Sequence, residues 1–317
     1  MNAPGERVPP GAALGAWIKA RALAEGFDDC EVVAADTPLV DAQRLVDAVQ
    51  DGRLAPFPWM AETLDQRTDL RRRLPWARSV LVVVQSYFTG NHADFLEVGA
   101  LAGRARVSRY AWGSDYHCFL RRRLRRLRRA LLEQTGGGRC APFLDVDAVF
   151  ERAWAKTAGL GFIGKSGLLI HRGLGTWTFL GGLASEVDLG PCLRAPVTEA
   201  CGTCTACLDA CPTHAITGPN VVDARRCLVT WNIEEALDAR GDAEGMTGHG
   251  WAAGCDVCQE VCPWNRFAKR TGEARFLPRP GHVAFGVEDA PVDVEGTPLA
   301  RPGVEVLPAL AARALKL

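Results

Sequence analysis

The sequence predicts an α+β protein in which a larger domain of mixed helices and strands precedes a small cysteine-rich domain. Over the first 190 residues, segments with helical spacing of apolar residues are interspersed with short continuous apolar runs. Eight of the twelve cysteines then fall between residues 201 and 262. The chain of 317 residues has room for two such domains, and its composition is that of an ordinary globular protein.

The first elements follow from the spacing of apolar residues. Residues 11–26 have helical spacing that ends at Gly26, and the run SVLVVV at 79–84 is typical of a buried strand. A second helix is expected over 118–134 because four leucines form one apolar stripe along it: Leu120, Leu124, Leu127 and Leu131. Three successive glycines from Gly136 then end this helix.

The later elements are shorter. Residues 141–150 are expected to form a strand, and 151–158 a helix that stops at Gly159. GLLIH at 167–171 and the segment 176–185 are expected to be two further strands.

A domain boundary is expected near the Gly190-Pro191 turn. The mixed α/β domain then covers 1–190 and the cysteine-rich domain 191–270. Residues 271–317 are rich in proline, glycine and charge, so we expect a tail that wraps over the body and ends in a short helix.

The cysteine-rich domain carries two runs typical of iron–sulfur proteins. The first, CGTCTACLDACP at 201–212, has the C-x2-C-x2-C-x3-C-P spacing of bacterial two-cluster ferredoxins. The second, CDVCQEVCP at 255–263, is one cysteine short, and Cys227 between the runs supplies the eighth thiolate. Zinc sites tend to pair C-x2-C units and do not need a third close thiolate. The spacing therefore favours a dicluster ferredoxin-like domain over a zinc or disulfide domain.

The fourth cysteine of such a run binds the neighbouring cluster, which predicts how the eight thiolates are shared. One 4Fe–4S cluster is assigned Cys201, Cys204, Cys207 and Cys262. The other is assigned Cys211, Cys227, Cys255 and Cys258. The remaining four are expected to be buried or partly buried apolar residues: Cys30, Cys118, Cys140 and Cys192. Two neighbouring clusters carry single electrons, so the first 190 residues should hold the group that accepts them.

Charge and hydropathy exclude several partners. Lys and Arg together number 37, as do Asp and Glu, so no global field attracts polyanions. The run RRRLRRLRR at 121–129 is the one dense positive patch; such a run is usually a solvated helix face, but it could follow a phosphate backbone. No signal sequence or membrane span is visible, so we expect a cytoplasmic protein without a membrane partner. We also expect a monomer.

The stretch GLGFIGKS at 159–166 matches the Walker A pattern G-x-x-x-x-G-K-S/T. A phosphate-binding loop follows a strand and opens a helix, so that the helix N-terminus faces the phosphates. Here a helix precedes the stretch and a strand follows it. The order favours a glycine-rich helix-to-strand turn, whose backbone N–H groups could still hold another ligand.

Candidate acids and bases gather in VSRYAWGSDYH at 107–117 and in FLDVDAVFER at 143–152. Asp145 ends a predicted strand and is a natural general acid if burial raises its pKa. An ordinary turn or helix-capping carboxylate is an equal alternative for Asp145. Core or rim packing is the simpler interpretation of Tyr110 and His117.

These residues resemble the epoxyqueuosine reductases, cobalamin-dependent iron–sulfur enzymes of tRNA queuosine synthesis. The resemblance runs from about residue 10 to about residue 280 and includes the segments 78–87, 107–117, 143–170 and 254–267 with the lone Cys227. General ferredoxins lack the Trp-Asn that follows the final Cys-Pro here.

The resemblance implies a base-off cobalamin in the N-terminal domain, two 4Fe–4S clusters, and reduction of epoxyqueuosine in the tRNA anticodon loop with electrons from an external donor. Asp145 would be the proton donor, although this chain reads Asp-Val-Asp-Ala from Asp145 where relatives usually read Asp-Thr-x-Pro. Corrin contacts are implied for Gly164, Lys165, Ser166, Arg67, Ser108, Arg109 and Tyr110.

The sequence is also compatible with two other functions. One is a cobalamin and iron–sulfur reductase of a small molecule, as in reductive dehalogenases. The other is a non-enzymatic electron carrier with a large additional domain. An absorbance spectrum of anaerobically purified protein separates the carrier from the enzymes, because only the enzymes would add corrin bands to the iron–sulfur absorption.

Overall fold

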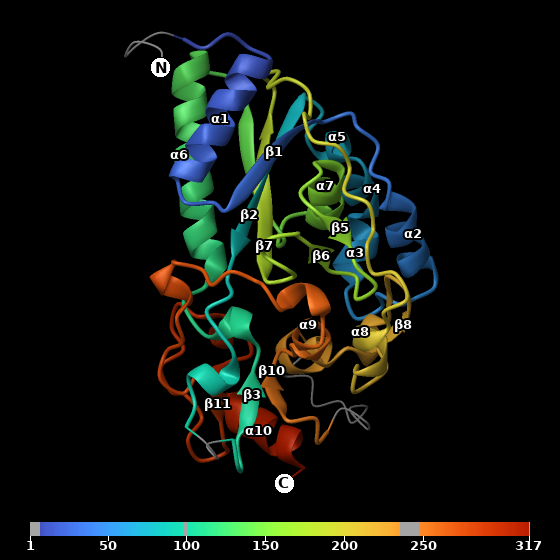
Figure 1. Cartoon of the computed structure of the whole chain (residues 1–317), viewed down its shortest axis with the longest axis vertical. Coiled ribbons are helices and arrows are strands. Elements are labelled where there is room, and N and C mark those ends of the chain that lie inside the picture. The colour runs from blue at the N-terminus through green and yellow to red at the C-terminus, as the bar shows by residue number, and fades with distance from the viewer. Residues whose placement is uncertain (1–6, 98–100, 235–246, 317) are drawn as a thin grey trace.

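A four-stranded antiparallel sheet forms the centre of the N-terminal part in the computed structural model, which describes residues 7–97, 101–234 and 247–316. The strand order is β1 (Asp29–Ala34), β2 (Ser79–Ser86), β7 (Thr178–Ser185) and β4 (Cys140–Leu144). Every residue of β2 is buried, which explains its continuous apolar sequence. The α+β fold class predicted from the sequence is confirmed (Figure 1).

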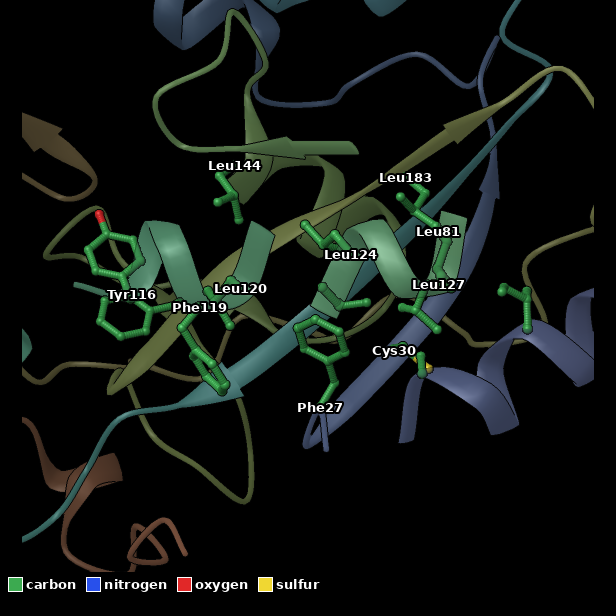
Figure 2. Packing of buried hydrophobic residues seen from close by; sticks show 14 of the residues in the cluster. Phe27, Cys30, Leu81, Tyr116, Phe119, Leu120, Leu124, Leu127, Leu144 and Leu183 are labelled. Carbon is green, nitrogen blue, oxygen red and sulfur yellow. The ribbon is translucent and has the colours of Figure 1, made fainter. Parts of the chain in front are cut away.

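One face of this sheet is covered by α1 (Ala12–Ala24) and α6 (Tyr116–Thr135). The four leucines of the predicted stripe are almost fully buried, and Figure 2 shows Leu120, Leu124 and Leu127 on the side of α6 that faces the strands. The helix ends at Gly136, whose φ of 76° lies in the left-handed region that glycine adopts readily. Both helices expected from the spacing are therefore present.

The opposite face carries α7 (Glu151–Thr157), which contacts β2 and β7. Four further helices lie on this side of the molecule (Figure 1): α2 (Ala42–Gln50), α3 (Pro58–Glu62), α4 (Leu64–Thr68) and α5 (Leu70–Arg73). Sequence reasoning did not identify these four helices. Three of them are only four or five residues long, which is too short for a periodic pattern to develop.

Two expectations from the sequence, the length of one strand and the burial of one thiol, differ from the structure. The strand expected over 141–150 ends at Leu144, because the N–H of Asp147 donates to the carbonyl of Leu144 and turns the chain. The thiol of Cys118, expected to be buried or partly buried, is exposed on α6, whereas Cys30 and Cys140 are buried and Cys192 is intermediate.

A second sheet unites three distant parts of the chain. Its order is β10 (Trp251–Ala253), β3 (Ala105–Val107) and β11 (Ala284–Phe285), and α10 (Leu307–Leu315) packs against β10 and β3. The final helix expected in the tail is thus confirmed. The tail does more than wrap over the body, because it also supplies an edge strand and part of a separate apolar core.

The cysteine-rich part contains two short helices that contact each other, α8 (Ala206–Asp209) and α9 (Val257–Glu260). Each lies within one of the two cysteine runs, and the hairpin of β8 (Ile216–Gly218) and β9 (Val221–Val222) follows the first run. One-turn 3₁₀ or π segments occur at His92–Asp94, Arg109–Ala111, Ala224–Arg226, Thr230–Glu234, Pro263–Asn265, Ala274–Phe276, Pro298–Ala300 and Val304–Val306. None of the helices in the described part of the chain has the length and apolarity that a membrane crossing requires.

Candidate functional site

The first group of thiols comes from both cysteine runs. Burial raises the pKa of Cys207, and the neighbouring thiols of Cys262, Cys201 and Cys204 raise it further. Burial likewise raises the pKa of Cys262, again with contributions from Cys201 and Cys204. These four residues are the set that the sequence assigns to one cluster.

The second group contains the lone cysteine. Burial raises the pKa of Cys258 well above its ordinary value, and Cys255, Cys227 and Cys211 add to the effect. Burial also raises the pKa of Cys255 to about 12. The structure therefore brings together the four residues assigned to the other cluster, and Cys227 reaches them from between the runs.

The chemistry of these thiols fits iron–sulfur clusters. All twelve cysteines are free thiols, and a thiol must lose its proton before it binds metal. A buried thiol with a raised pKa loses its proton readily only when positive charge lies nearby. The irons of a cluster provide this charge. No set of His, Cys, Asp and Glu residues in the described ranges could hold a single metal ion. This observation does not conflict with cubanes, in which each cysteine binds a different iron. The Ala215 N–H also donates to Cys211 Sγ at 3.2 Å.

A buried acid in the second cysteine run anchors that run to the rest of the molecule. Asp256 is fully buried and accepts hydrogen bonds from Ser108 Oγ at 2.5 Å and from Arg109 Nη1 at 2.9 Å. Arg109 Nη1 also donates to Glu260 Oε1 at 2.9 Å. Although burial raises the pKa of Glu260, His92 and Arg109 lower it to about 2. The side chains of Ser108 and Arg109 therefore bind α9 and the residue before it.

The glycine-lysine stretch at 159–166 leads from α7 into a short hairpin, which confirms the expected glycine-rich helix-to-strand turn. It contains β5 (Phe162–Ile163), which pairs with β6 (Leu169–Ile170), and the Gly164 N–H donates to the Leu168 carbonyl at 2.9 Å. A strand rather than a helix follows the glycines, so the stretch lacks the helix N-terminus with which a phosphate-binding loop faces its phosphates.

Lys165 and Gly164 lie against the first cysteine run. Lys165 Nζ donates to the carbonyls of Gly202 at 2.7 Å and Cys204 at 2.9 Å. A Cβ at Gly164 would lie 3.6 Å from Cys201 Sγ and only 2.5 Å from Ile170 Cδ1, so a side chain has little room there. Lys165 thus fixes the loop of the first cysteine run.

Asp145 lies just after β4 and meets the first residues of α6. Tyr116 Oη donates a short hydrogen bond to Asp145 Oδ2. His117 Nε2 lies 3.2 Å from Asp145 Oδ1 without a well-aligned hydrogen bond, and His117 Nδ1 lies 2.7 Å from Asp115 Oδ1. The Asp145 side chain keeps 40% of its surface exposed, so it can still meet a ligand.

The pKa shifts at this site are opposite to those expected for an isolated buried acid and an isolated buried imidazole. Burial raises the pKa of Asp145, but the contacts with His117 and Tyr116 outweigh burial and lower it. Burial lowers the pKa of His117, but the carboxylates of Asp115 and Asp145 raise it to about 9. The expected net rise in the pKa of Asp145 is therefore not found. At neutral pH Asp145 is ionised and the proton resides on His117.

The loop that carries Asp145 is held from both sides of the sheet. Asp147 Oδ1 accepts from Arg73 of α5 at 3.1 Å, and Asp147 Oδ2 lies 3.4 Å from Arg121 of α6. Arg67, which is buried, donates to the Val149 carbonyl at 3.3 Å. Sequence reasoning missed the role of Asp147, because its partners Arg73 and Arg121 belong to helices that are distant from it in the sequence.

The other residues implied by the resemblance lie nearby. Tyr110 packs edge to face on Tyr116, with ring centroids 6.5 Å apart, and burial raises its pKa. Ser166 is partly buried in the hairpin turn next to Lys165. The structure thus places Tyr110 and Asp145 at the start of α6 and Arg67 against the loop that follows Asp145. Gly164 and Lys165, with Ser166 next to them, lie beside the first cysteine run.

Comparison with known proteins explains this combination. Residues 200–265 match the family model described as "4Fe-4S double cluster binding domain", which includes all eight cysteines. Residues 67–146 match the model "Epoxyqueuosine reductase QueG, DUF1730". A curated epoxyqueuosine reductase of Synechocystis sp. is 40% identical over 243 residues, which cover 76% of this chain and 81% of the relative.

The chain belongs to the epoxyqueuosine reductase family.

Other relatives agree. The epoxyqueuosine reductase of Gloeobacter violaceus is 40% identical over 269 residues, covering 83% of this chain and 81% of the relative. Among solved structures, an epoxyqueuosine reductase crystallised with a tRNA-Tyr epoxyqueuosine-modified tRNA stem loop has a TM-score of 0.83 at 23% identity, covering 95% of this chain and 80% of that one. An epoxyqueuosine reductase from Streptococcus thermophilus has a TM-score of 0.79 at 24% identity, covering 95% of this chain and 80% of that one. These structures support the fold of the whole chain.

Proposed function

We propose that this member of the family reduces epoxyqueuosine to queuosine in the anticodon loop of tRNA. The observation that carries the proposal is the 40% identity to curated epoxyqueuosine reductases over most of both chains. The site adds independent support, because an acid–imidazole pair and eight clustered thiols occur in one molecule.

The overall reaction sets the chemistry that the site must support. Converting an epoxide to an alkene consumes two electrons and two protons, and the oxygen leaves as water. When bound, the two 4Fe–4S clusters would supply single electrons from an external donor, and a cobalamin would supply the reductive chemistry. The chain's own residues must hold these groups and supply the protons.

The described residues fit this division of work. The two sets of four cysteines would bind the clusters, and Asp256, Arg109 and Lys165 would hold the cysteine runs against the N-terminal domain. Arg67, Tyr110, Gly164 and Ser166 remain the candidates for corrin contacts, together with Ser108.

Asp145 and His117 would act together as the proton source. An alkoxide leaves poorly unless a proton arrives in the same step. The contacts with His117 and Tyr116 lower the pKa of Asp145, so a proton must first reach it, and His117, whose pKa is raised, lies 3.2 Å away. We propose that Asp145 delivers to the epoxide oxygen a proton that it receives from His117.

The decisive experiment uses the full chain, purified without oxygen and shown by its spectrum to hold iron–sulfur clusters and corrin. It is incubated with tRNA that contains epoxyqueuosine and a strong chemical reductant, and the digested nucleosides are analysed by mass. We expect conversion of epoxyqueuosine to a product lacking one oxygen atom. Intact epoxyqueuosine after incubation with fully loaded protein would contradict the proposed function.

A further inference from the structure

The seven arginines between Arg121 and Arg129 on α6 differ in their contacts. Four are held by other parts of the protein: Arg121 by Asp147, Arg123 by Glu273, Arg126 by Glu25, and Arg128 by the Cys140 carbonyl. The other three, Arg122, Arg125 and Arg129, are exposed and form no hydrogen bond or ion pair with any other residue in the described ranges. We call these three residues the arginine track.

The arginine track is a continuous row. Its members are three and four residues apart, a spacing that places them on one face of a helix. The helical period puts this face opposite the buried leucines, so it points away from the sheet. At about 1.5 Å per residue the row is about 10 Å long.

A shallow groove lies beside this row. It has a volume of about 550 Å³ and is lined by Arg125, Arg128, Arg129, Leu132, Glu133 and Pro142. Arg128 is fixed at its wall, because Arg128 Nε donates to the Cys140 carbonyl at 2.8 Å. Three cations therefore face one carboxylate here, in a chain whose formal net charge is zero.

The track lies on the same helix as two residues that contact Asp145. The first residues of α6, Tyr116 and His117, contact Asp145, and Arg122 follows His117 by about 7 Å along the same helix. Figure 1 shows α6 as a long helix at the outer edge of the N-terminal part. Five positions along α6 place Arg122 about 140° around the helix axis from His117, so a substrate that reaches both Asp145 and the track passes around the start of α6.

We propose that Arg122, Arg125 and Arg129 bind the phosphate backbone of the tRNA substrate and orient its anticodon stem along α6. This inference rests on the proposed function, which supplies the nucleic acid. Each strand of a duplex carries one charge per about 3.4 Å, so a row of about 10 Å corresponds to about three phosphates. Cations without protein partners suit such a regular polyanion, and they discriminate little between base sequences.

The test compares two variants that lose the same charge. The track variant is R122Q/R125Q/R129Q, in which glutamine preserves helix propensity. The control variant is R21Q/R126Q/R139Q, which removes three exposed arginines that are already paired with Glu25 or Glu186. Binding of an anticodon stem–loop RNA without epoxyqueuosine is measured by fluorescence anisotropy between about 50 and 200 mM salt.

For the track variant we expect binding weakened by about tenfold or more at low salt, and a salt slope reduced by about two to three, since each phosphate contact contributes about 0.7–0.9. The control variant should keep most of the affinity and the slope. With a chemical reductant, KM for tRNA should rise in the track variant while kcat at saturating tRNA stays unchanged.

Equal losses in the two variants would overturn the proposal, because they would show a general effect of charge. So would unchanged RNA binding in the track variant combined with slower reduction by an acidic protein donor, since the track would then serve a protein. If the wild type binds RNA through the track but leaves epoxyqueuosine intact, the proposed function fails while the track stands.

Discussion

The acid–base site works as a pair, because neither Asp145 nor His117 has its ordinary protonation behaviour. The pKa of Asp145 is lower than that of a free carboxyl, and the pKa of His117 is raised to about 9. The pairing arises from consecutive residues at the start of α6, where Asp115 holds the ring of His117 from the other side. A sequence can indicate such residues, but the sign of their pKa shifts depends on contacts between segments about thirty residues apart.

The D145N substitution keeps the shape of the side chain and removes its ability to transfer a proton. We expect turnover of epoxyqueuosine to fall by about 10²–10⁴-fold, the usual range for loss of a positioned acid. The iron–sulfur and corrin absorbance should remain, and substitution of the exposed Asp36 by asparagine should leave turnover unchanged. Full activity of the D145N variant would remove Asp145 from the mechanism.

The pKa of His117 predicts how stability depends on pH. Its folded pKa of about 9 exceeds the unfolded value of 6.5, so the stabilisation is complete below about pH 6.5 and is lost as pH rises through 9. Between these values the thermal midpoint of the wild type should decrease relative to that of H117Q. The corresponding change in the free energy of unfolding should be of order 1 kcal/mol after allowance for solvent screening. Parallel midpoint curves for the two proteins would argue against a charged pair.

At the scale of secondary structure elements, local patterns account for the long elements but not for the junctions. The leucine stripe defines α6 and the apolar run defines β2, because both patterns lie within one segment. The end of β4 depends on Asp147, whose partners Arg73 and Arg121 belong to two other helices. Lys165 similarly finds its carbonyl partners in a loop nearly forty residues later. Such contacts leave no periodic signal.

Asp256 joins α9 to the 3₁₀ turn at Arg109, and we expect its loss to be costly. In D256N the buried Arg109 loses a formal charge partner, and breaking a buried ion pair typically costs about 3–5 kcal/mol. Glu260 still contacts Arg109 and should hold the loss to the lower part of that range. Unfolding by denaturant without oxygen measures the difference.

The matched control for this prediction is D51N, which breaks the exposed ion pair between Asp51 and Arg53. Such exposed pairs contribute about 0–1 kcal/mol. If D256N and D51N destabilise the protein equally, Asp256 does not anchor the second cysteine run in the way described.

At the scale of the whole molecule, the cysteine runs could be interpreted from spacing alone, whereas their surroundings could not. The grouping of Cys227 with Cys211, Cys255 and Cys258 in the structure coincides with the set assigned from the sequence. The contribution of the tail was not predictable, because β11 has only two residues and exists through its pairing with β3. The assignment of ligands to individual clusters remains a prediction.

Iron content tests that assignment in the intact protein. C227A should lose one cluster and fall from about eight to about four irons per chain, because one cubane would lack a ligand. Substitution of the exposed Cys118 on α6 by alanine should leave iron content unchanged. An iron content of about eight in C227A would exclude Cys227 as a ligand.

The second sheet also bears on how the protein closes around its second cysteine run. The strand that leads into Cys255 lies beside β3, and the other edge of β3 is closed by β11, which follows Cys262 by about twenty residues. The helix α10 then covers the same core. The apolar core beside this cysteine run is therefore complete only when segments that follow the run have joined it.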